Sequence, residues 1–168
     1  MNYKIIIFIS LVLGLSLSAN SQSKIDKTLE RYNSNSVDYI SVENLIQLKA
    51  SHPNVKLLDA REPSEFSISH IQNAIYAGYD DFELENIKNK ISTQDTIVVY
   101  CSIGVRSENI GEELQEAGYE HVYNLYGGIF EWFNKNNAIY DQKGQSTEKI
   151  HAYSRFWSKY LKRGEKVY

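Results

Sequence analysis

The feature that most constrains the fold is the run of residues 96–100, Thr-Ile-Val-Val-Tyr, which is apolar and rich in β-branched side chains. Such a run predicts a strand that is buried on both faces, as in a parallel sheet. Further strands are expected over residues 55–59 and 121–125, and helical segments over residues 41–51, 63–68 and 105–117. Strands that alternate with helices imply βαβ units. The sequence therefore predicts an α/β fold with a central, mostly parallel sheet flanked by helices.

Several helix ends are marked by residues that favour them. Ser41 is placed to cap the N-terminus of a helix, and Pro63 suits the first turn of the next one. Gly118 follows residues 105–117 and is suited to end that helix, because glycine adopts the left-handed backbone of helix C-termini. These signals divide the chain from residue 39 onward into short elements.

Residues 1–21 have the pattern of a secretory signal peptide. Lys4 supplies a positive charge, residues 5–17 form a short apolar run, and Ala19 and Ser21 are small residues at the positions that a signal peptidase reads. The apolar run is shorter than the ~20 residues of a membrane-spanning helix. We expect cleavage after Ser21 and a periplasmic or secreted protein with no stable membrane span. A buried core helix or an uncleaved anchor is the alternative.

Charge and cysteine content narrow the class of protein. The net charge of -3 argues against nucleic-acid binding, which normally requires a strong basic excess. Cys101 is the single cysteine, so an exported chain has no internal disulfide, and its thiol must be either buried or used. His52, His121 and His151 have no metal-ligand spacing, so neither a metal nor a cofactor is expected.

The chemistry is expected at Cys101, which directly follows the buried strand. In an open α/β sheet, ligands bind beyond the carboxyl ends of the strands. There the thiol faces a helix N-terminus, whose dipole and unpaired amides stabilise an anion and lower a thiol pKa. Gly104 permits the loop to bend around the sulfur, and Arg106 adds a fixed positive charge.

Four segments resemble motifs of the rhodanese-like sulfurtransferases. The Cys-x-x-Gly-x-Arg-Ser pattern of residues 101–107 is similar to the active-site loop of that family. The other three segments are Leu-Leu-Asp-Ala-Arg-Glu-Pro-Ser-Glu-Phe at 57–66, Ser-His-Ile-Gln-Asn-Ala at 69–74 and Asn-Leu-Tyr-Gly-Gly-Ile-Phe-Glu-Trp at 124–132. The resemblance covers residues 39–137 and implies a rhodanese-like, doubly wound fold. Residues 22–38 then form a lead-in, as a short helix or a loose segment.

The resemblance implies that Cys101 carries sulfane sulfur as a persulfide in a ping-pong reaction. A small anionic donor such as thiosulfate would supply the sulfur, and cyanide, a thiol or a protein sulfur acceptor would take it. The persulfide would be cradled by the loop amides of Ser102, Ile103, Gly104, Val105 and Arg106.

Three further residues of the resembling motifs are expected to support the site. Asp59 and Arg61 are expected to tie it together through a buried ion pair, with direct substrate contact by Arg61 as the alternative. His70 is expected to bond a nearby backbone group. Ser69 and Asn73 stand where the family usually has glycine, and asparagine tolerates the left-handed backbone well.

Two other functions are compatible with the same residues. A cysteine phosphatase or arsenate reductase uses a Cys-x5-Arg loop, whereas Cys101 and Arg106 give Cys-x4-Arg, which suits a single sulfur better than a tetrahedral oxyanion. A non-catalytic binding module, or a sulfur carrier that depends on a partner, would have the same Cys101 and Arg106.

Residues 138–168 form a C-terminal extension beyond the resembling region. Ile150, Tyr153, Phe156, Trp157, Tyr160 and Leu161 recur at helical spacing. This spacing predicts an amphipathic helix that docks on the domain, because exposed Trp and Phe side chains would be costly. Binding to a partner or an acidic surface is the alternative.

Overall fold

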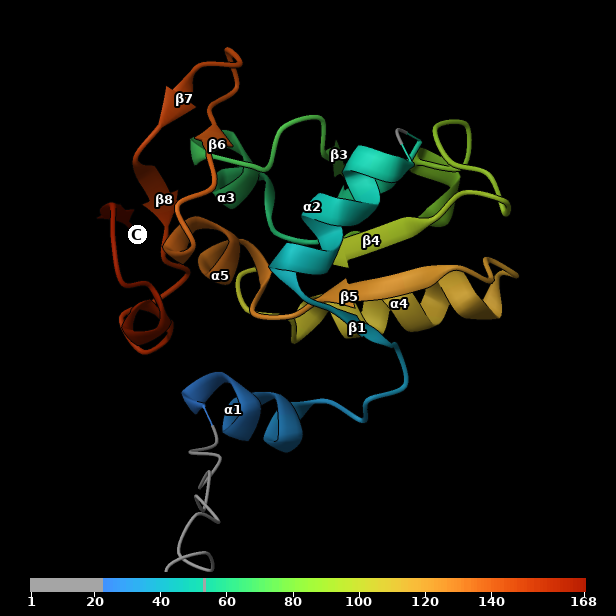
Figure 1. Ribbon diagram of the computed structural model, residues 1–168, viewed down its shortest axis with the longest axis horizontal. Coiled ribbons are helices and arrows are strands. Elements are labelled where there is room, and N and C mark those ends of the chain that lie inside the picture. Colours follow the sequence, from blue (N-terminus) through green and yellow to red (C-terminus); the bar gives the residue numbers. More distant parts are fainter. Residues whose placement is uncertain (1–22, 53) are drawn as a thin grey trace, which may run out of the picture.

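The computed structural model describes residues 23–52 and 54–168. Its five-stranded sheet has the order β1-β5-β4-β2-β3, and all neighbouring strands are parallel. The strands are β1 Tyr39–Ile40, β2 Lys56–Asp59, β3 Ile75–Tyr76, β4 Ile97–Tyr100 and β5 Val122–Leu125. The helices are α1 Lys24–Tyr32, α2 Val42–Ser51, α3 Pro63–Ile68, α4 Arg106–Glu116 and α5 Gly128–Asn134. The predicted α/β fold, with its parallel sheet flanked by helices, is confirmed (Figure 1).

Helices cover both faces of the sheet, because successive side chains of a strand point to opposite faces. Val98 and Tyr100 of β4 share one hydrophobic cluster with side chains of α1, α2 and α5. Ile97 and Val99 share the other cluster with Ile110 and Leu114 of α4 and with others. Burial on both sides explains why the predicted strand reads as an unbroken apolar run.

The strand order reverses beside β4, which fixes where a ligand can bind. The chain runs from β2 to the neighbouring β3 in one direction and from β4 to β5 in the other. A crevice is expected at such a reversal, beyond the carboxyl ends of the strands. The arrowheads of β4 and β5 point toward the side on which the C-terminal extension lies (Figure 1). The extension is therefore at the functional edge of the sheet.

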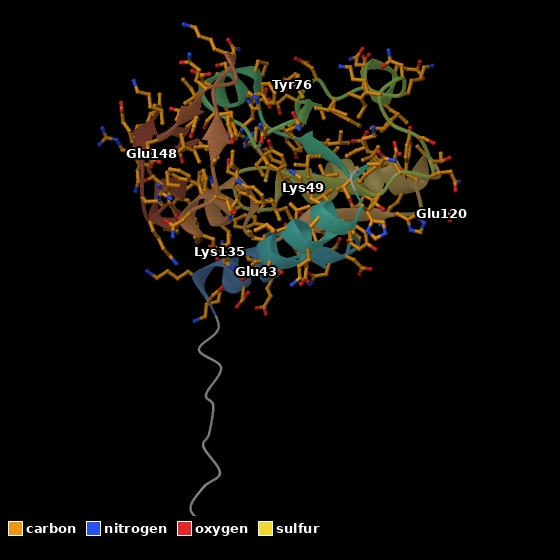
Figure 2. The ribbon with its side chains drawn as sticks, turned by 45° about the horizontal axis from the view of Figure 1, so that its top comes forward. Glu43, Lys49, Tyr76, Glu120, Lys135 and Glu148 are labelled. Atoms are coloured by element: carbon orange, nitrogen blue, oxygen red, sulfur yellow. The ribbon has the colours of Figure 1, made fainter. Side chains whose placement is uncertain are left out.

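The lead-in contains a helix that packs on the domain. Ser23 and Asp26 form a capping box at the start of α1, and Ile25 and Leu29 belong to the larger core cluster. Elsewhere on the surface, Lys135 after α5 lies 2.6 Å from the carboxylate of Glu43 in α2 (Figure 2). No helix in the described part of the chain is long and apolar enough to span a membrane. Residues 1–21, for which a signal peptide is predicted, lie outside the described residues.

The predicted amphipathic helix in the C-terminal extension is wrong. The extension forms β6 Ile139–Tyr140 with β7 Ser146–Thr147, β8 Lys149–His151 with β9 Glu165–Val167, and a 3₁₀ turn, Trp157–Tyr160. Ile150 is a buried strand residue, whereas Phe156 is 58% exposed. Tyr153 has a φ of 61°, which a right-handed helix cannot contain. The apolar spacing is thus divided between a strand and a short turn.

Backbone pairing between distant residues replaces the helix. Gly164 has a φ of 83°, and a Cβ atom there would lie 2.4 Å from the ring of Phe133. Glycine therefore allows the chain to turn closely past α5 and to pair β9 with β8. Ile150, Tyr160 and Leu161 join the larger core cluster, so the extension packs on the domain without forming a helix.

Candidate functional site

Cys101 lies in the loop between β4 and α4, at the carboxyl edge of the sheet. The residue is buried, with a relative exposure of 2%, and Sγ accepts a hydrogen bond from the Gly104 amide at 3.2 Å. Gly104 has a φ of 111°, a backbone conformation that side-chain-bearing residues rarely adopt. The loop thus turns an amide back onto the sulfur, as an anion-binding loop does.

The surroundings of Cys101 favour its thiolate. Burial alone raises the pKa of the thiol, but the Arg106 charge and hydrogen bonds from Ser107 and from the Gly104 amide outweigh it and lower the pKa. The sulfur also lies near the N-terminus of α4, where the helix dipole favours negative charge. A lowered pKa increases the fraction of thiolate, which is the nucleophilic form of cysteine.

Arg106 makes a bidentate ion pair with Glu65, the third residue of α3. Its Nη1 and Nη2 atoms lie 2.6 and 2.8 Å from the two carboxylate oxygens of Glu65, whose side chain is 1% exposed. Burial acts to raise the Glu65 pKa, but the Arg106 hydrogen bonds and charge lower it overall. Ser102 Oγ donates to the same carboxylate at 3.1 Å. Arg106 is therefore charged but already largely neutralised by a partner.

Sequence reasoning missed Glu65, although a local signal was present. Glu65 is at the N3 position of a helix with proline at its start, and its carboxylate accepts the Glu62 amide at 3.1 Å. A glutamate at N3 is fully explained as part of a helix cap. Its second role depends on Arg106, 41 positions later, which only the pairing of β2 with β4 brings near.

Asp59 and Arg61 form the expected buried ion pair beneath the site. Arg61 Nε and Nη2 donate to the two Asp59 carboxylate oxygens at 2.8 and 2.6 Å, and both side chains are 0% exposed. Arg61 Nη2 also donates to the Ser69 carbonyl at 2.6 Å. His70 Nδ1 lies 3.2 Å from the Phe66 carbonyl, the kind of backbone contact expected for it. Full burial of Arg61 argues against the alternative of direct substrate contact.

Asn124 in β5 is a second residue that supports the site and that sequence reasoning did not identify. This buried side chain donates to the Gly104 carbonyl at 2.8 Å and accepts from the Ser107 hydroxyl at 2.8 Å. Asn33, after α1, donates to the same Gly104 carbonyl at 2.8 Å. The Gly104 turn is thus fixed from two sides. Asn124 stands in a motif segment of the family resemblance, but its role depends on strand pairing between β4 and β5.

The five loop residues predicted to cradle sulfur have different surroundings. The Gly104 amide points at Sγ, whereas the Ser102 hydroxyl is committed to Glu65. Ile103 is buried, and Val105 is the residue before α4. The carbonyls of Cys101 and Ser102 accept amides of α5, which ties the loop down from below.

A cavity of about 320 Å³ opens over the sulfur. This size is at the lower end of small-molecule sites, which span roughly 300–1,000 Å³. Its lining combines loop residues with acidic and aromatic side chains from other parts of the chain: Tyr32, Glu62, Tyr79, Asp80, Cys101, Ser102, Ile103, Val105, Arg106, Tyr153 and Trp157. Within residues 23–52 and 54–168, no three His, Cys, Asp or Glu side chains converge as metal ligands do. Cys101 is thus one of the residues that line a cavity of small-molecule size.

Comparison with known proteins gives matches over most of the chain. The chain is 30% identical over 134 residues to the uncharacterized protein YqhL of Bacillus subtilis, covering 80% of this chain and 94% of that protein. It is 31% identical to the thiosulfate sulfurtransferase GlpE of Shewanella oneidensis, covering 60% of this chain and 97% of that protein. Some other relatives are longer, and the chain spans 39%, 55% and 29% of three of them.

The fold is likewise shared with solved structures. The BH2092 protein of Bacillus halodurans superposes with a TM-score of 0.55 at 20% identity, covering 71% of this chain and 88% of that protein. The family model described as Rhodanese-like domain matches residues 41–135, which is more than half of the chain. That match contains β2, the Cys101 loop and the strand that carries Asn124. The chain therefore belongs to the rhodanese-like domain family.

Proposed function

We propose that this protein is a sulfurtransferase that carries sulfane sulfur as a persulfide on Cys101. The observation that supports the proposal most directly is a buried thiol of lowered pKa that lines an accessible cavity. A nucleophilic sulfur of this kind attacks electrophilic sulfur readily. The name of the GlpE relative, a thiosulfate sulfurtransferase, is consistent with the same chemistry.

The reaction has two displacement steps at sulfur. The Cys101 thiolate attacks the outer sulfur of thiosulfate, the bond between the two thiosulfate sulfurs breaks, and sulfite leaves with the electron pair. In the second step, cyanide attacks the terminal persulfide sulfur, thiocyanate forms and the Cys101 thiolate is restored. Both steps keep negative charge near Gly104 and the N-terminus of α4, whose amides and dipole stabilise it throughout.

A partner-dependent sulfur carrier is the second candidate function. The bidentate pairing of Arg106 with Glu65 favours it, because a guanidinium that is already neutralised attracts free thiosulfate less strongly. The same pairing argues against a phosphatase, which requires its loop arginine for the phosphate group. A carrier would hold the Cys101 persulfide stably but accept sulfur from thiosulfate slowly.

Intact mass spectrometry tests sulfur transfer at Cys101. Incubation with thiosulfate is expected to add one sulfur atom to the wild-type chain, and cyanide is expected to remove it. Cys101→Ser is the matched control and should show neither change. An unmodified wild-type mass, under conditions that load a known sulfurtransferase, would contradict catalysis with thiosulfate. Loading by polysulfide alone would favour the carrier.

We also propose that the chain is exported and cleaved after Ser21. The charge of Lys4, the apolar run at 5–17 and the small residues Ala19 and Ser21 support this proposal. N-terminal sequencing of the protein from its native host, after separation of envelope and cytoplasm, tests it. A chain that retains Met1 in the cytoplasmic fraction would rule the proposal out.

A further inference from the structure

Aromatic rings from both ends of the described chain wall the cavity over Cys101. Tyr32 is the last residue of α1, and Tyr153 and Trp157 belong to the C-terminal extension. All three lie outside residues 41–135, the part that matches the family model. The Tyr32 and Trp157 ring centroids are 5.8 Å apart, so the two flanking segments meet at the cavity. Three of the four aromatic residues that line the cavity therefore come from the parts of the chain that flank the matched domain, and Tyr79 comes from the domain itself.

Tyr153 is held over the site at a conformational cost. Its φ of 61° is unusual for a bulky side chain and is stabilised only where the surroundings impose it. Its amide donates to His151 Nδ1 at 3.1 Å, and its ring centroid lies 4.7 Å from the Arg106 guanidinium carbon. Tyr153 is 48% exposed as a residue, and it lines the cavity, so it is available to contact a bound molecule.

The charges around the cavity attract a dianion less strongly than a neutral or positively charged molecule. Among the described residues that line it, Arg106 is the single cation, and Glu65 already pairs with that cation in two hydrogen bonds. Glu62 and Asp80 add two carboxylates to the lining. Aromatic faces attract cations and pack against apolar groups. The lining therefore favours an organic molecule that is neutral or positively charged.

We propose that the cavity selects organic thiols as acceptors of the Cys101 sulfur and prefers ammonium-bearing thiols to carboxylate-bearing ones. This inference rests on the proposed sulfur transfer at Cys101. The acceptor thiol first loses its proton to solvent, and its thiolate then attacks the outer sulfur of the Cys101 persulfide. The bond between the two persulfide sulfurs breaks, the Cys101 thiolate leaves with the electron pair, and the acceptor departs as a persulfide.

The test compares three thiols of similar size on the full chain. Cys101 is first loaded with polysulfide, and loading is verified by intact mass and by discharge with cyanide. Discharge rates are then measured with cysteamine, 2-mercaptoethanol and 3-mercaptopropionate, each normalised to its thiolate concentration and to its rate with free cysteine persulfide. We expect cysteamine to exceed 3-mercaptopropionate by roughly tenfold, the size of one partly exposed cation–π contact together with charge repulsion.

Variants test whether the aromatic residues of the cavity cause the preference for cysteamine. Tyr153→Gly keeps the left-handed backbone but removes the ring. Trp157→Phe is the milder second variant, which keeps an aromatic group and serves if larger truncations fail to fold. Tyr153→Gly should reduce the preference several-fold, and Trp157→Phe should reduce it less, because phenylalanine keeps a smaller aromatic face. Asp80→Asn should reduce the advantage of cysteamine over 2-mercaptoethanol. Tyr168→Ala removes an exposed ring of the same extension that does not line the cavity, and should leave the preference unchanged.

The possible outcomes separate the two proposals. Failure of Cys101 to load with any sulfur donor would overturn the proposed sulfur transfer, and the inference with it. Normal loading and cyanide discharge with rates that match the free persulfide would overturn the inference alone. The same conclusion would follow if 3-mercaptopropionate were the fastest thiol, or if Tyr153→Gly and Trp157→Phe both kept the wild-type preference.

Discussion

Replacing Glu65 by glutamine tests how much the buried pair with Arg106 stabilises the protein. The variant keeps the shape of the side chain but removes its charge. Removal of one partner from a buried ion pair costs about 3–5 kcal/mol. Glu65 is 1% exposed and Arg106 13% exposed, so this range applies. Glutamine retains one oxygen acceptor for the guanidinium, and we therefore expect the lower end, a loss of about 3 kcal/mol at pH 7.

The chain contains a matched control pair of the same chemistry on its surface. Arg163 Nη2 lies 2.9 and 2.7 Å from the two carboxylate oxygens of Glu148, whose side chain is 66% exposed. An exposed pair contributes about 0–1 kcal/mol because water screens it. Glu148→Gln should therefore cost less than about 1 kcal/mol. Arg163 contacts both oxygens through one nitrogen and Arg106 through two, so the difference between the two variants reports the effect of burial together with that of the two-nitrogen geometry.

The pH dependence of the Glu65→Gln effect has a defined sign. The pKa of Glu65 is lowered in the folded protein, so the carboxylate contributes stability above its unfolded pKa of about 4.3. That contribution is lost as pH falls through the lower, folded-state pKa. Urea unfolding of wild type and variant at pH 7, and at successively lower pH, measures the change. Equal losses for Glu65→Gln and Glu148→Gln at pH 7, or a loss independent of pH, would refute the reasoning.

Three further predictions concern the thiol, its loop and the extension. The alkylation rate of Cys101 should rise with pH at a midpoint below that of an unperturbed thiol, and Arg106→Ala should move that midpoint upward because burial then dominates. Asn124→Ala removes a hydrogen-bond partner of the Gly104 carbonyl and of the Ser107 hydroxyl. It should lower the free energy of unfolding, measured in urea, by about 1–3 kcal/mol. Tyr160 is 5% exposed, and its hydroxyl is hydrogen-bonded to Thr28. Tyr160→Phe should therefore lower the free energy of unfolding by about 1 kcal/mol. Tyr160→Ala should cost roughly 3–5 kcal/mol in thermal unfolding, and no change would show that the extension does not stabilise the domain.

Elements specified by local sequence were predicted well. Ser41 caps α2 by accepting the Asn44 amide at 3.1 Å, Pro63 is the first residue of α3, and β4 lies within residues 96–100. Asn73 has a φ of 63°, so asparagine keeps the left-handed backbone at a position where the family usually has glycine. Each of these features depends on a residue and its immediate neighbours, which is the information that a sequence pattern contains.

The extension was mispredicted because periodicity does not distinguish a helix from other arrangements that bury the same residues. Ile150, Tyr160 and Leu161 are buried, as the helical spacing suggested. Their burial is achieved by β8 and by the 3₁₀ turn with the residue after it, and residues 152–164 cross over so that β9 pairs in parallel with β8. Such pairing depends on residues far apart in the chain, and Gly164 alone does not reveal its partner.

The site shows the same division between local and distant information. Cys101, Gly104 and Arg106 are close in sequence, so their convergence around one sulfur was predictable. The ion pair between Arg106 and Glu65 was not predictable from the sequence. It requires α3, which follows β2, to face the loop that follows β4. This distant contact changes the functional expectation, since a free arginine would attract thiosulfate and a paired one does so less. On the proposed function, side chains around the loop would then determine substrate preference more than the loop motif itself.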